Sequence, residues 1–447
     1  ATAEKLDDYR VKFTFSGPTN RELPNIVGQL SVLPKHYYET IEFTETSLAA
    51  PVGSGPYRVG SFEPGRFIEY ERVADYWGSD LPVNVGRYNF DSVRYDYYRD
   101  ATVAREAFKS YEFDTYPEFS AGNWATGYDF PAARNGLVIK EEIPDLTSPG
   151  MQAFIFNTRR EIFADRTVRQ AIGLAFDFEW SNKALFFGQY KRTISYFENM
   201  ELAARGLPEG AELKYLLPHQ DLLPADLFTQ IFSVEKTDGS GNPRRELRTA
   251  AHLLRSAGWQ IRDGTLTHSK SGRALKFEVL LIQPSLEKVV LPFIGNLKKL
   301  GIDASVRTVD PAQYQSRTNT FDFDMVIGTF RQSFSPGNEQ RDFWGSDSAD
   351  RNGGRNLIGI KDPVVDALIE KIISAPDRLS LVAATRALDR VLLWGHYVIP
   401  QYYAPTDRLA YWDKFGQPET KPKFGVDLFS WWIDSDKLTI IETHRRP

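Results

Sequence analysis

Apolar residues recur along the chain with two spacings, one typical of strands and one typical of helices. Every second position is apolar at 10–16 and at 321–328, and the segment 151–157 carries phenylalanines on one face. A period of two predicts a strand with one buried face, because successive side chains point to opposite sides of a sheet. We therefore predict strands at these three places.

Helical spacing follows two predicted start signals. Apolar positions step by three and four after Asp165, a predicted N-cap, and Asp362 followed by proline predicts another helix start. A similar stripe at 247–257 ends before Gly258, which is typical of a helix C-terminus. Further elements are expected as a turn at 51–60 leading into a strand from Tyr57, a helix at about 101–110, a helix at about 379–394 and a strand at 398–403.

A strand, a helix and a strand follow one another at 277–282, 285–300 and 304–309. Ser285 is the predicted N-cap of the helix, and Gly301 ends it. The short connections are typical of a βαβ unit. The order of elements therefore predicts an α/β fold built in layers.

Aromatic residues form two dense segments, at 111–130 and at 330–344. The chain holds 9 Trp, 21 Tyr and 30 Phe, or 13% of its residues, which is more than a core of ordinary composition needs. Two interpretations of 111–130 remain open: a locally buried aromatic cluster, or the wall of a ligand site.

Length and charge exclude several classes of protein. The 447 residues are enough for roughly three domains, and the net charge of -5 offers no global attraction for nucleic acid. There is no cysteine, so disulfides and thiolate metal sites are excluded. The sequence has no apolar run long enough to span a bilayer and no signal peptide at its amino end, so a cytosolic and a processed secreted protein both remain possible.

Catalytic and metal motifs are missing from the sequence. The six histidines form no His-x-x-x-His pair, and there is no Gly-x-Ser-x-Gly elbow or Walker loop. The segment 347–354 resembles a calcium loop but lacks the third ligand and the twelfth-position acid, so we expect a surface turn. We therefore expect a binding protein rather than an enzyme, with no metal and no cofactor.

Three motifs carry a resemblance to a known family. They are Gly-Ser-Gly-Pro-Tyr at 53–57, Phe-Asn-Thr at 156–158 and Asp-Arg-Thr-Val-Arg-Gln-Ala at 165–171. Here the chain resembles the family 5 extracellular solute-binding proteins of bacterial ABC importers. Segments 196–207, 237–242, 335–344 and 355–363 are similar to the YejA-like subgroup, which is associated with uptake of oligopeptides, microcin C and cell-wall peptides.

The resemblance implies a type II (cluster C) periplasmic-binding-protein fold. Two α/β lobes joined by hinge strands would close on a ligand, with a remnant of a third, accessory subdomain at 1–50. Lobe I would combine 51–157 with 406–447, and lobe II would be 158–405. The family also implies a preceding segment and signal peptide that this chain lacks, and hence a periplasmic location.

The same resemblance implies the partners and the site. We expect a monomer that captures a peptide and delivers it to the inner-membrane permease subunits of an ABC importer, without nucleic acid. Arg341 or Arg355 would bind a carboxylate or phosphate. Glu339, in preference to Asp342 or Glu198, would pair with the peptide ammonium group, unless the ligand's amino end is not the anchor. The expected ligand contacts are Tyr116, Phe119, Trp124, Asn157, Tyr196, Glu198, Asn338, Glu339, Arg341, Trp344, Arg355 and Asn356.

Three alternatives remain open at this point. A receptor of the same fold could bind an oligosaccharide, an opine or another non-peptide solute, because fold alone does not decide the ligand. A glycosidase or esterase would need a carboxylate pair or an activated serine at a cleft. An adhesin or chaperone would use the aromatic residues as a contact patch.

Overall fold

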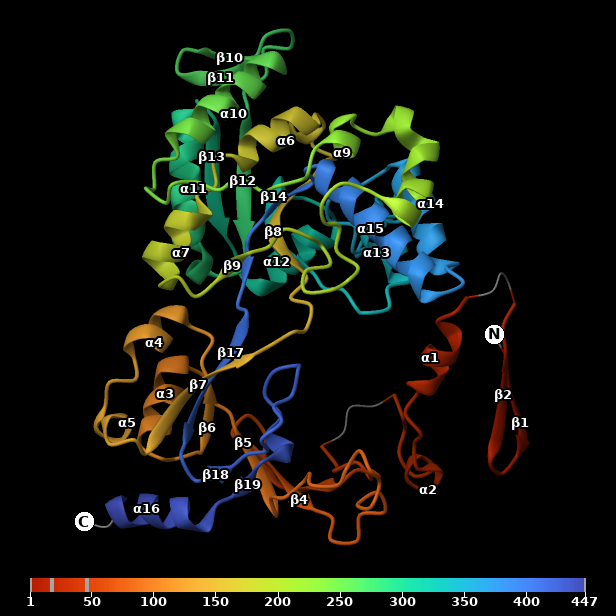
Figure 1. Ribbon diagram of the computed structural model, residues 1–447, viewed down its shortest axis with the longest axis vertical. Coiled ribbons are helices and arrows are strands. Elements are labelled where there is room, and N and C mark those ends of the chain that lie inside the picture. Colours follow the sequence, from red (N-terminus) through yellow and green to blue (C-terminus); the bar gives the residue numbers. More distant parts are fainter. Residues whose placement is uncertain (1, 17–19, 45–47, 446–447) are drawn as a thin grey trace. The chain divides into compact units, whose positions relative to one another are not determined.

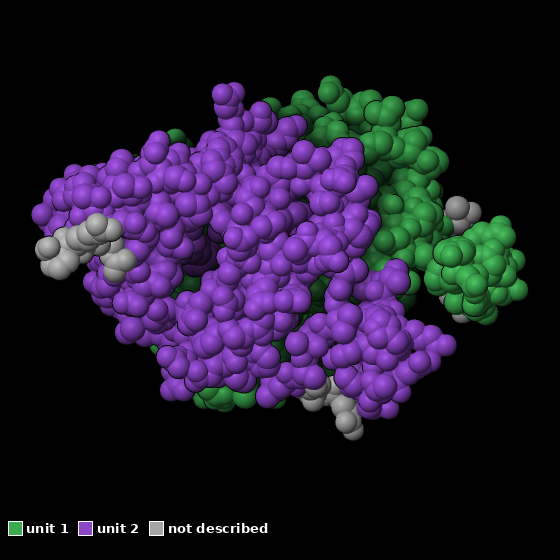
Figure 2. Space-filling view, turned by 90° about the horizontal axis from the view of Figure 1, so that it is seen from below, with its two compact units in different colours: residues 1–30, 148–183, 192–403 green, residues 31–147, 184–191, 404–447 purple. Residues whose placement is uncertain are grey.

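The computed structural model describes residues 2–16, 20–44 and 48–445 (Figure 1). The chain divides into two compact units, which Figure 2 shows in different colours. Unit 1 comprises residues 1–30, 148–183 and 192–403, and unit 2 comprises residues 31–147, 184–191 and 404–447. The lobe boundaries expected from the resemblance stay a prediction.

A five-stranded mixed sheet forms the centre of unit 1, in the strand order β13-β12-β14-β8-β15. β12 lies parallel to β13 and β14, whereas β8 is antiparallel to β14 and β15. Helix α11 connects β12 to β13, which confirms the predicted βαβ unit. These elements are β8 (Met151–Phe156), β12 (Lys276–Leu281), α11 (Glu287–Lys299), β13 (Asp303–Thr308), β14 (Met325–Phe330) and β15 (Val398–Pro400).

Strand β8 is buried on both faces, because helices cover both sides of the sheet (Figure 1). On one side the Phe154 ring lies 4.9 Å from that of Phe293 on α11. On the other side Ile155 belongs to the large core cluster that includes residues of α14 (Pro363–Ile373) and α15 (Arg378–Trp394). A strand covered on both faces needs a continuous apolar run, which explains its sequence.

The remaining elements of unit 1 are mostly short. The strands are β1 (Thr2–Asp7), β2 (Arg10–Thr14), β10 (Trp259–Arg262), β11 (Thr265–His268) and β16 (Tyr402–Tyr403). The two residues of β9 (Lys191–Arg192) are assigned to different units, Lys191 to unit 2 and Arg192 to unit 1. The α-helices are α1 (Leu23–Gly28), α6 (Arg166–Gly173), α7 (Phe178–Phe186), α8 (Gly210–Leu216), α9 (Asp226–Thr229), α10 (Arg244–Ser256), α12 (Pro311–Asn319) and α13 (Glu339–Trp344), and the last three residues of α7 are assigned to unit 2. The 3₁₀ helices are η1 (Glu161–Phe163), η2 (Leu217–Leu222), η3 (Pro284–Leu286) and η4 (Ser346–Ser348).

The predicted helix ends are confirmed with one exception. Asp165 caps α6 by accepting the Thr167 backbone N–H at 2.7 Å. Gly258 directly follows the C-cap of α10 with φ +85°, a backbone conformation that favours glycine. The assignment of Ser285 as an N-cap is wrong, because it lies inside η3 and α11 begins after Leu286.

Unit 2 is built around two three-stranded sheets, β3-β4-β5 and β6-β17-β7. Strand β17, from the C-terminal part of the chain, pairs antiparallel with β6 and β7. The strands are β3 (Tyr57–Glu63), β4 (Phe67–Arg72), β5 (Ser92–Asp96), β6 (Thr115–Pro117), β7 (Val138–Pro144), β17 (Thr406–Trp412), β18 (Phe415–Gly416) and β19 (Trp432–Ile433). The helices are α2 (Lys35–Tyr38), α3 (Ala101–Lys109), α4 (Ala121–Thr126), α5 (Pro131–Arg134), η5 (Leu428–Ser430) and α16 (Ser435–Arg445).

Three expectations from the hydrophobic pattern need correction. The strand predicted at 10–16 forms as β2, but it has no buried face because all of its residues are exposed. The alternation at 321–328 predicts a strand from residue 321, but β14 begins at Met325 because the chain at Phe321 has φ +55° and cannot yet be extended. The hydrophobic pattern predicts its last helix at about 379–394, whereas a further helix, α16, forms after it. Its apolar positions are too few to give a helical stripe.

The described helices are all too short or too polar to cross a membrane.

Candidate ligand-binding site

The Glu339 carboxylate, at the start of α13, is held by neutral donors alone. Its Oε1 and Oε2 accept the Gly337 backbone N–H at 3.0 and 3.1 Å, and the Gln340 side-chain amide donates to Oε1 at 3.0 Å. No arginine or lysine pairs with Glu339 among the described residues. A cationic ligand group would therefore meet a carboxylate whose charge no side chain neutralises.

Arg341, two residues further on, already has a two-pronged partner. Its Nε and Nη2 donate to the Glu370 carboxylate at 2.8 and 2.7 Å, and its Nη1 donates to Asn338 Oδ1 at 3.0 Å. The hydrogen bonds to Glu370 raise the pKa of Arg341 above its ordinary value. A ligand carboxylate would have to displace Glu370 to use both prongs of this guanidinium.

The guanidinium of Arg355 lies over the ring of Phe343, with its central carbon 5.0 Å from the ring centre. In the part of the chain that the structure describes, no carboxylate pairs with Arg355. Of the two predicted anion-binding arginines, Arg355 is thus the one whose guanidinium N–H groups could bind a ligand carboxylate without displacing a carboxylate of the described chain.

The two other acids considered for the ligand ammonium group have cations beside them. Glu198 accepts from Arg205 Nη2 at 2.8 Å and from the Ile194 backbone N–H at 2.9 Å. Asp342 accepts from Arg351 Nη2 at 2.5 Å. Their charges are balanced within the protein, in contrast to that of Glu339.

Tyr196 and Trp344 lie together in the core of unit 1. Their ring centres are 5.1 Å apart, and both side chains are fully buried. The Trp344 Nε1 donates to Gln340 Oε1 at 2.8 Å, whereas the Tyr196 hydroxyl has no hydrogen-bond partner among the described residues. Burial raises the pKa of Tyr196 well above its ordinary value. These two rings are thus part of the core of unit 1.

Asn157 and Asn356 are fully buried and bind backbone groups. The Asn157 side-chain amide donates to the carbonyls of Phe321 and Phe323 at 3.0 and 2.7 Å. The Asn356 amide donates to two carbonyls at 3.1 Å, and its oxygen accepts two backbone N–H groups at 2.9 and 3.0 Å. Both polar atoms of the Asn356 side chain are thus used, in holding the 356–360 turn and in binding the Gly345 carbonyl.

A buried aspartate on α15 shapes the loop that carries Tyr196. Asp389 accepts from the Ser195 hydroxyl at 2.7 Å and from the Tyr196 and Ala204 backbone N–H groups at 2.9 and 2.8 Å. Burial outweighs these hydrogen bonds and raises the pKa of Asp389 to about 6. The sequence analysis missed this residue, although an acid inside the apolar stripe of α15 is a signal that could have revealed it.

A polar cavity of about 560 Å³ lies at the surface of unit 1 beside Asn157. Arg159 borders it, but this guanidinium donates to Asn157 and to the carbonyls of Ala349, Asn356 and Leu357. Burial lowers the pKa of Arg159 to about 10. The cavity wall is therefore fixed by internal hydrogen bonds. Its lining residues are Thr158, Arg159, Ala164, Arg169, Asp350, Gly359, Ile360, Lys361 and Tyr397.

In unit 2 the aromatic segment is mainly a local core. Trp124 is buried, and Tyr116 stacks on Phe108 with ring centres 6.0 Å apart. Phe119, in contrast, is 83% exposed. The interpretation as a buried cluster thus accounts for Trp124 and Tyr116, and Phe119 is the aromatic side chain here that a ligand could reach.

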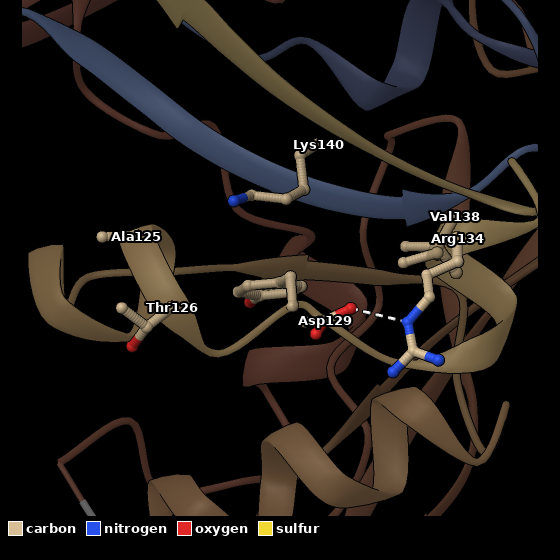
Figure 3. Close-up of a pocket in the computed structure, with 8 residues that line it drawn as sticks. Ala125, Thr126, Asp129, Arg134, Val138 and Lys140 are labelled. Atoms are coloured by element: carbon tan, nitrogen blue, oxygen red, sulfur yellow. Dashed lines mark hydrogen bonds and ion pairs between the residues drawn. The ribbon is translucent and has the colours of Figure 1, made fainter.

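A cavity of about 450 Å³ opens beside this cluster (Figure 3). Lys140 projects toward it, with Nζ 4.5 Å from the centre of the Trp124 ring, and burial lowers the pKa of Lys140. Asp129 and Arg134 pair at 2.6 Å across its edge. The lining residues are Ala125, Thr126, Tyr128, Asp129, Ala133, Arg134, Val138 and Lys140.

Eight of the twelve predicted contacts fall into three groups. Asn338, Glu339 and Arg341 are neighbours on one loop and helix, and Tyr196 and Trp344 pack together. Tyr116, Phe119 and Trp124 belong to unit 2. As ligand contacts, all twelve residues stay a prediction. Among the described residues there is no cluster of three His, Asp or Glu side chains that could hold a metal ion.

The arrangement of strands and helices corresponds to that of periplasmic binding proteins of type II. The oligopeptide-binding protein AppA from Bacillus subtilis, solved with a nonapeptide, matches 97% of this chain and 78% of its own length, with a TM-score of 0.69 and 20% identity. This likeness confirms the predicted α/β fold class. At 20% identity, the solved structure thus shows the fold of the molecule.

The particular family follows from the sequence. The family described as bacterial extracellular solute-binding proteins, family 5 Middle, matches residues 1–352, and the chain belongs to this family. The probable peptide-binding protein YejA from Agrobacterium fabrum is 44% identical over 96% of this chain and 72% of its own length. The peptidoglycan-binding protein YepA from the same organism is 38% identical over 97% of this chain and 72% of its own length. The predicted resemblance is confirmed.

Proposed function

We propose that this protein is the peptide-binding receptor of a bacterial ABC importer. The observation that carries the proposal is the 44% identity to a probable peptide-binding protein over 96% of the chain. The peptidoglycan-binding relative supports cell-wall peptides as one ligand class, and the fold is shared with a receptor solved around a nonapeptide. A non-peptide solute is not favoured by these relatives.

The charges of unit 1 support a specific way of holding a peptide. Glu339 is held by neutral donors and can pair with the ligand ammonium group, and Arg355 can bind its carboxylate. A receptor for many sequences must use the groups that all peptides share, namely their backbone and their terminal charges. Exposed Phe119 offers an apolar surface that accommodates varied side chains.

The protein binds without chemical turnover in this proposal. It works in the periplasm as a monomer and passes its peptide to inner-membrane permease subunits. The relatives are named as binding proteins, which supports this role. Incubation with peptide followed by chromatography should return the peptide intact, and cleavage above a blank would contradict the proposal.

The ligand class is tested by mass spectrometry of material extracted from the purified protein. A ladder of peptide masses, or a muropeptide, is the expected result. Addition of free peptides to the emptied protein should then raise its melting temperature, since a ligand at about 100 times its dissociation constant stabilises by roughly 2.7 kcal/mol. A discrete sugar in the extract, with no stabilisation by any peptide, would overturn the proposal.

A further inference from the structure

Two residues near the start of the chain hold the loop that precedes α13. Arg21 donates from Nη1 to the Ser335 hydroxyl at 2.7 Å and from Nη2 to the Pro336 carbonyl at 2.5 Å. Glu22 accepts, through Oε2, both the backbone N–H of Asn338 at 2.9 Å and its side-chain amide at 3.1 Å. These four hydrogen bonds join segments that are 314 to 316 positions apart in sequence. We call them the 21–22 clasp.

The clasp requires a glycine in the loop. A Cβ atom at Gly337 would lie 1.8 Å from Glu22 Oε2, far inside van der Waals contact. The φ angle of Gly337 is not in the left-handed region, so the backbone itself would accept alanine. The glycine is needed because the Glu22 carboxylate approaches the chain at this point.

The clasp and Glu339 act on the same turn of backbone. The N–H of Gly337 binds Glu339, and the next N–H along the chain, that of Asn338, binds Glu22. The two carboxylates are therefore fixed by adjacent peptide units. Loss of Glu22 would release one of these units and allow the turn that holds Glu339 to move.

We propose that Glu22 is a positioning residue for the Glu339 carboxylate, and so for recognition of a ligand ammonium group. This inference rests on the proposed function, because it takes Glu339 as the partner of the peptide amino terminus. Glu22 itself need not touch the ligand. Its effect should be confined to ligands that carry a free ammonium group.

The test compares Glu22→Ala with Glu4→Ala, a matched change at an exposed position of strand β1, which pairs with β2. Calorimetry gives the dissociation constants of one peptide with a free amino group and of its N-acetylated form. We expect Glu22→Ala to raise the dissociation constant of the peptide with a free amino group by about threefold to tenfold, and to leave that of the acetylated peptide unchanged. Glu4→Ala should change neither. Equal weakening of both peptides would overturn the positioning role.

Two further variants separate position from charge. Glu22→Gln keeps an oxygen that can accept from Asn338, so it should restore most of the lost affinity. In Gly337→Ala the added methyl group would push the Glu22 carboxylate away from the loop. This variant should therefore, like Glu22→Ala, weaken binding of the free peptide and not of the acetylated one. A Glu22→Gln protein as weak as Glu22→Ala would contradict the clasp geometry.

Amide hydrogen exchange tests the clasp without any ligand. The Asn338 amide should exchange faster in Glu22→Ala than in the wild type, because it loses its acceptor. An unchanged exchange rate of the Asn338 amide would overturn the clasp, regardless of the affinities measured for the two peptides. If the wild type binds free and acetylated peptides equally, the ammonium contact of the proposed function fails instead, and the exchange result still decides the clasp.

Discussion

Two groups of charged side chains in unit 1 differ in how their charge is balanced. Arg390 on α15 is fully buried and donates to Glu212 at 2.6 Å and to the Gly206 carbonyl at 2.8 Å. Glu339 and Arg355 have no partner of opposite charge in the described chain. The Arg390–Glu212 pair is thus neutralised inside unit 1, whereas Glu339 and Arg355 carry charges that no described side chain of opposite sign neutralises. Uncompensated charges are what a receptor needs to recognise both ends of a peptide.

The largest expected effect lies in the buried pair. Arg390→Met leaves Glu212 buried without its cation, which should lower the free energy of unfolding by about 3 to 5 kcal/mol. Urea denaturation measures this change. The matched control is Arg378→Met, which breaks the exposed pair with Glu201 and should cost less than about 1 kcal/mol. Equal effects of the two variants would remove the distinction between internal and exposed charges.

The second prediction concerns pH. Burial raises the pKa of Asp389 to about 6 from its ordinary 3.8, so the folded state binds this proton more tightly than the unfolded state. The contribution of Asp389 to stability is then most favourable below about pH 4 and is lost as the pH rises to about 6. Asp389→Asn cannot titrate. Between pH 4 and pH 7 the free energy of unfolding of the wild type should fall by about 2 to 3 kcal/mol relative to that of this variant.

Urea denaturation at four pH values gives the difference between the two proteins directly. Parallel curves for the wild type and Asp389→Asn would mean that the three hydrogen bonds to Asp389, and not its burial, dominate its pKa.

The third prediction concerns the uncompensated cation. Arg355→Gln should weaken the binding of a peptide with a free carboxyl end by about threefold to tenfold, because a charged two-pronged donor is lost. The same peptide with an amidated end should bind both proteins equally. The folded state loses only the contact with Phe343, worth about 0.5 to 1 kcal/mol. Equal weakening of both peptides would remove Arg355 from the carboxylate site.

The smallest effect is expected at Arg341, whose guanidinium is occupied by Glu370. Arg341→Met breaks an exposed pair and should lower the free energy of unfolding by less than about 1 kcal/mol. Peptide affinity should stay within about twofold of the wild type. A tenfold loss of affinity would instead show that the ligand displaces Glu370 and uses Arg341.

The sequence was informative where a local pattern decides the structure. The strand β8, the cap at Asp165 and the glycine after α10 depend on neighbouring residues, so periodicity and capping rules predicted them. The start of β14 was misplaced because alternation continues through Phe321, where the backbone turns. Helix α16 was missed because it has no apolar stripe of helical period.

The candidate site was less predictable, because it depends on contacts between distant residues. Arg341 and Arg355 look alike in sequence, and only the position of Glu370 separates them. The contact of Glu22 with Asn338 spans 316 positions, and no local pattern could indicate it. A charged residue within an apolar helical stripe, such as Asp389, was the one signal that sequence reasoning could have used and did not.

The central claim is that Glu339 recognises the ammonium group of a bound peptide. The most direct test is calorimetry of Glu339→Gln against the wild type, with a peptide whose amino end is free and with its acetylated form. Removal of one charged partner at such a contact costs about 2 to 5 kcal/mol, so the free peptide should bind more than tenfold more weakly to the variant. The acetylated peptide should bind the two proteins alike. Unchanged affinity of Glu339→Gln for the free peptide would contradict the account.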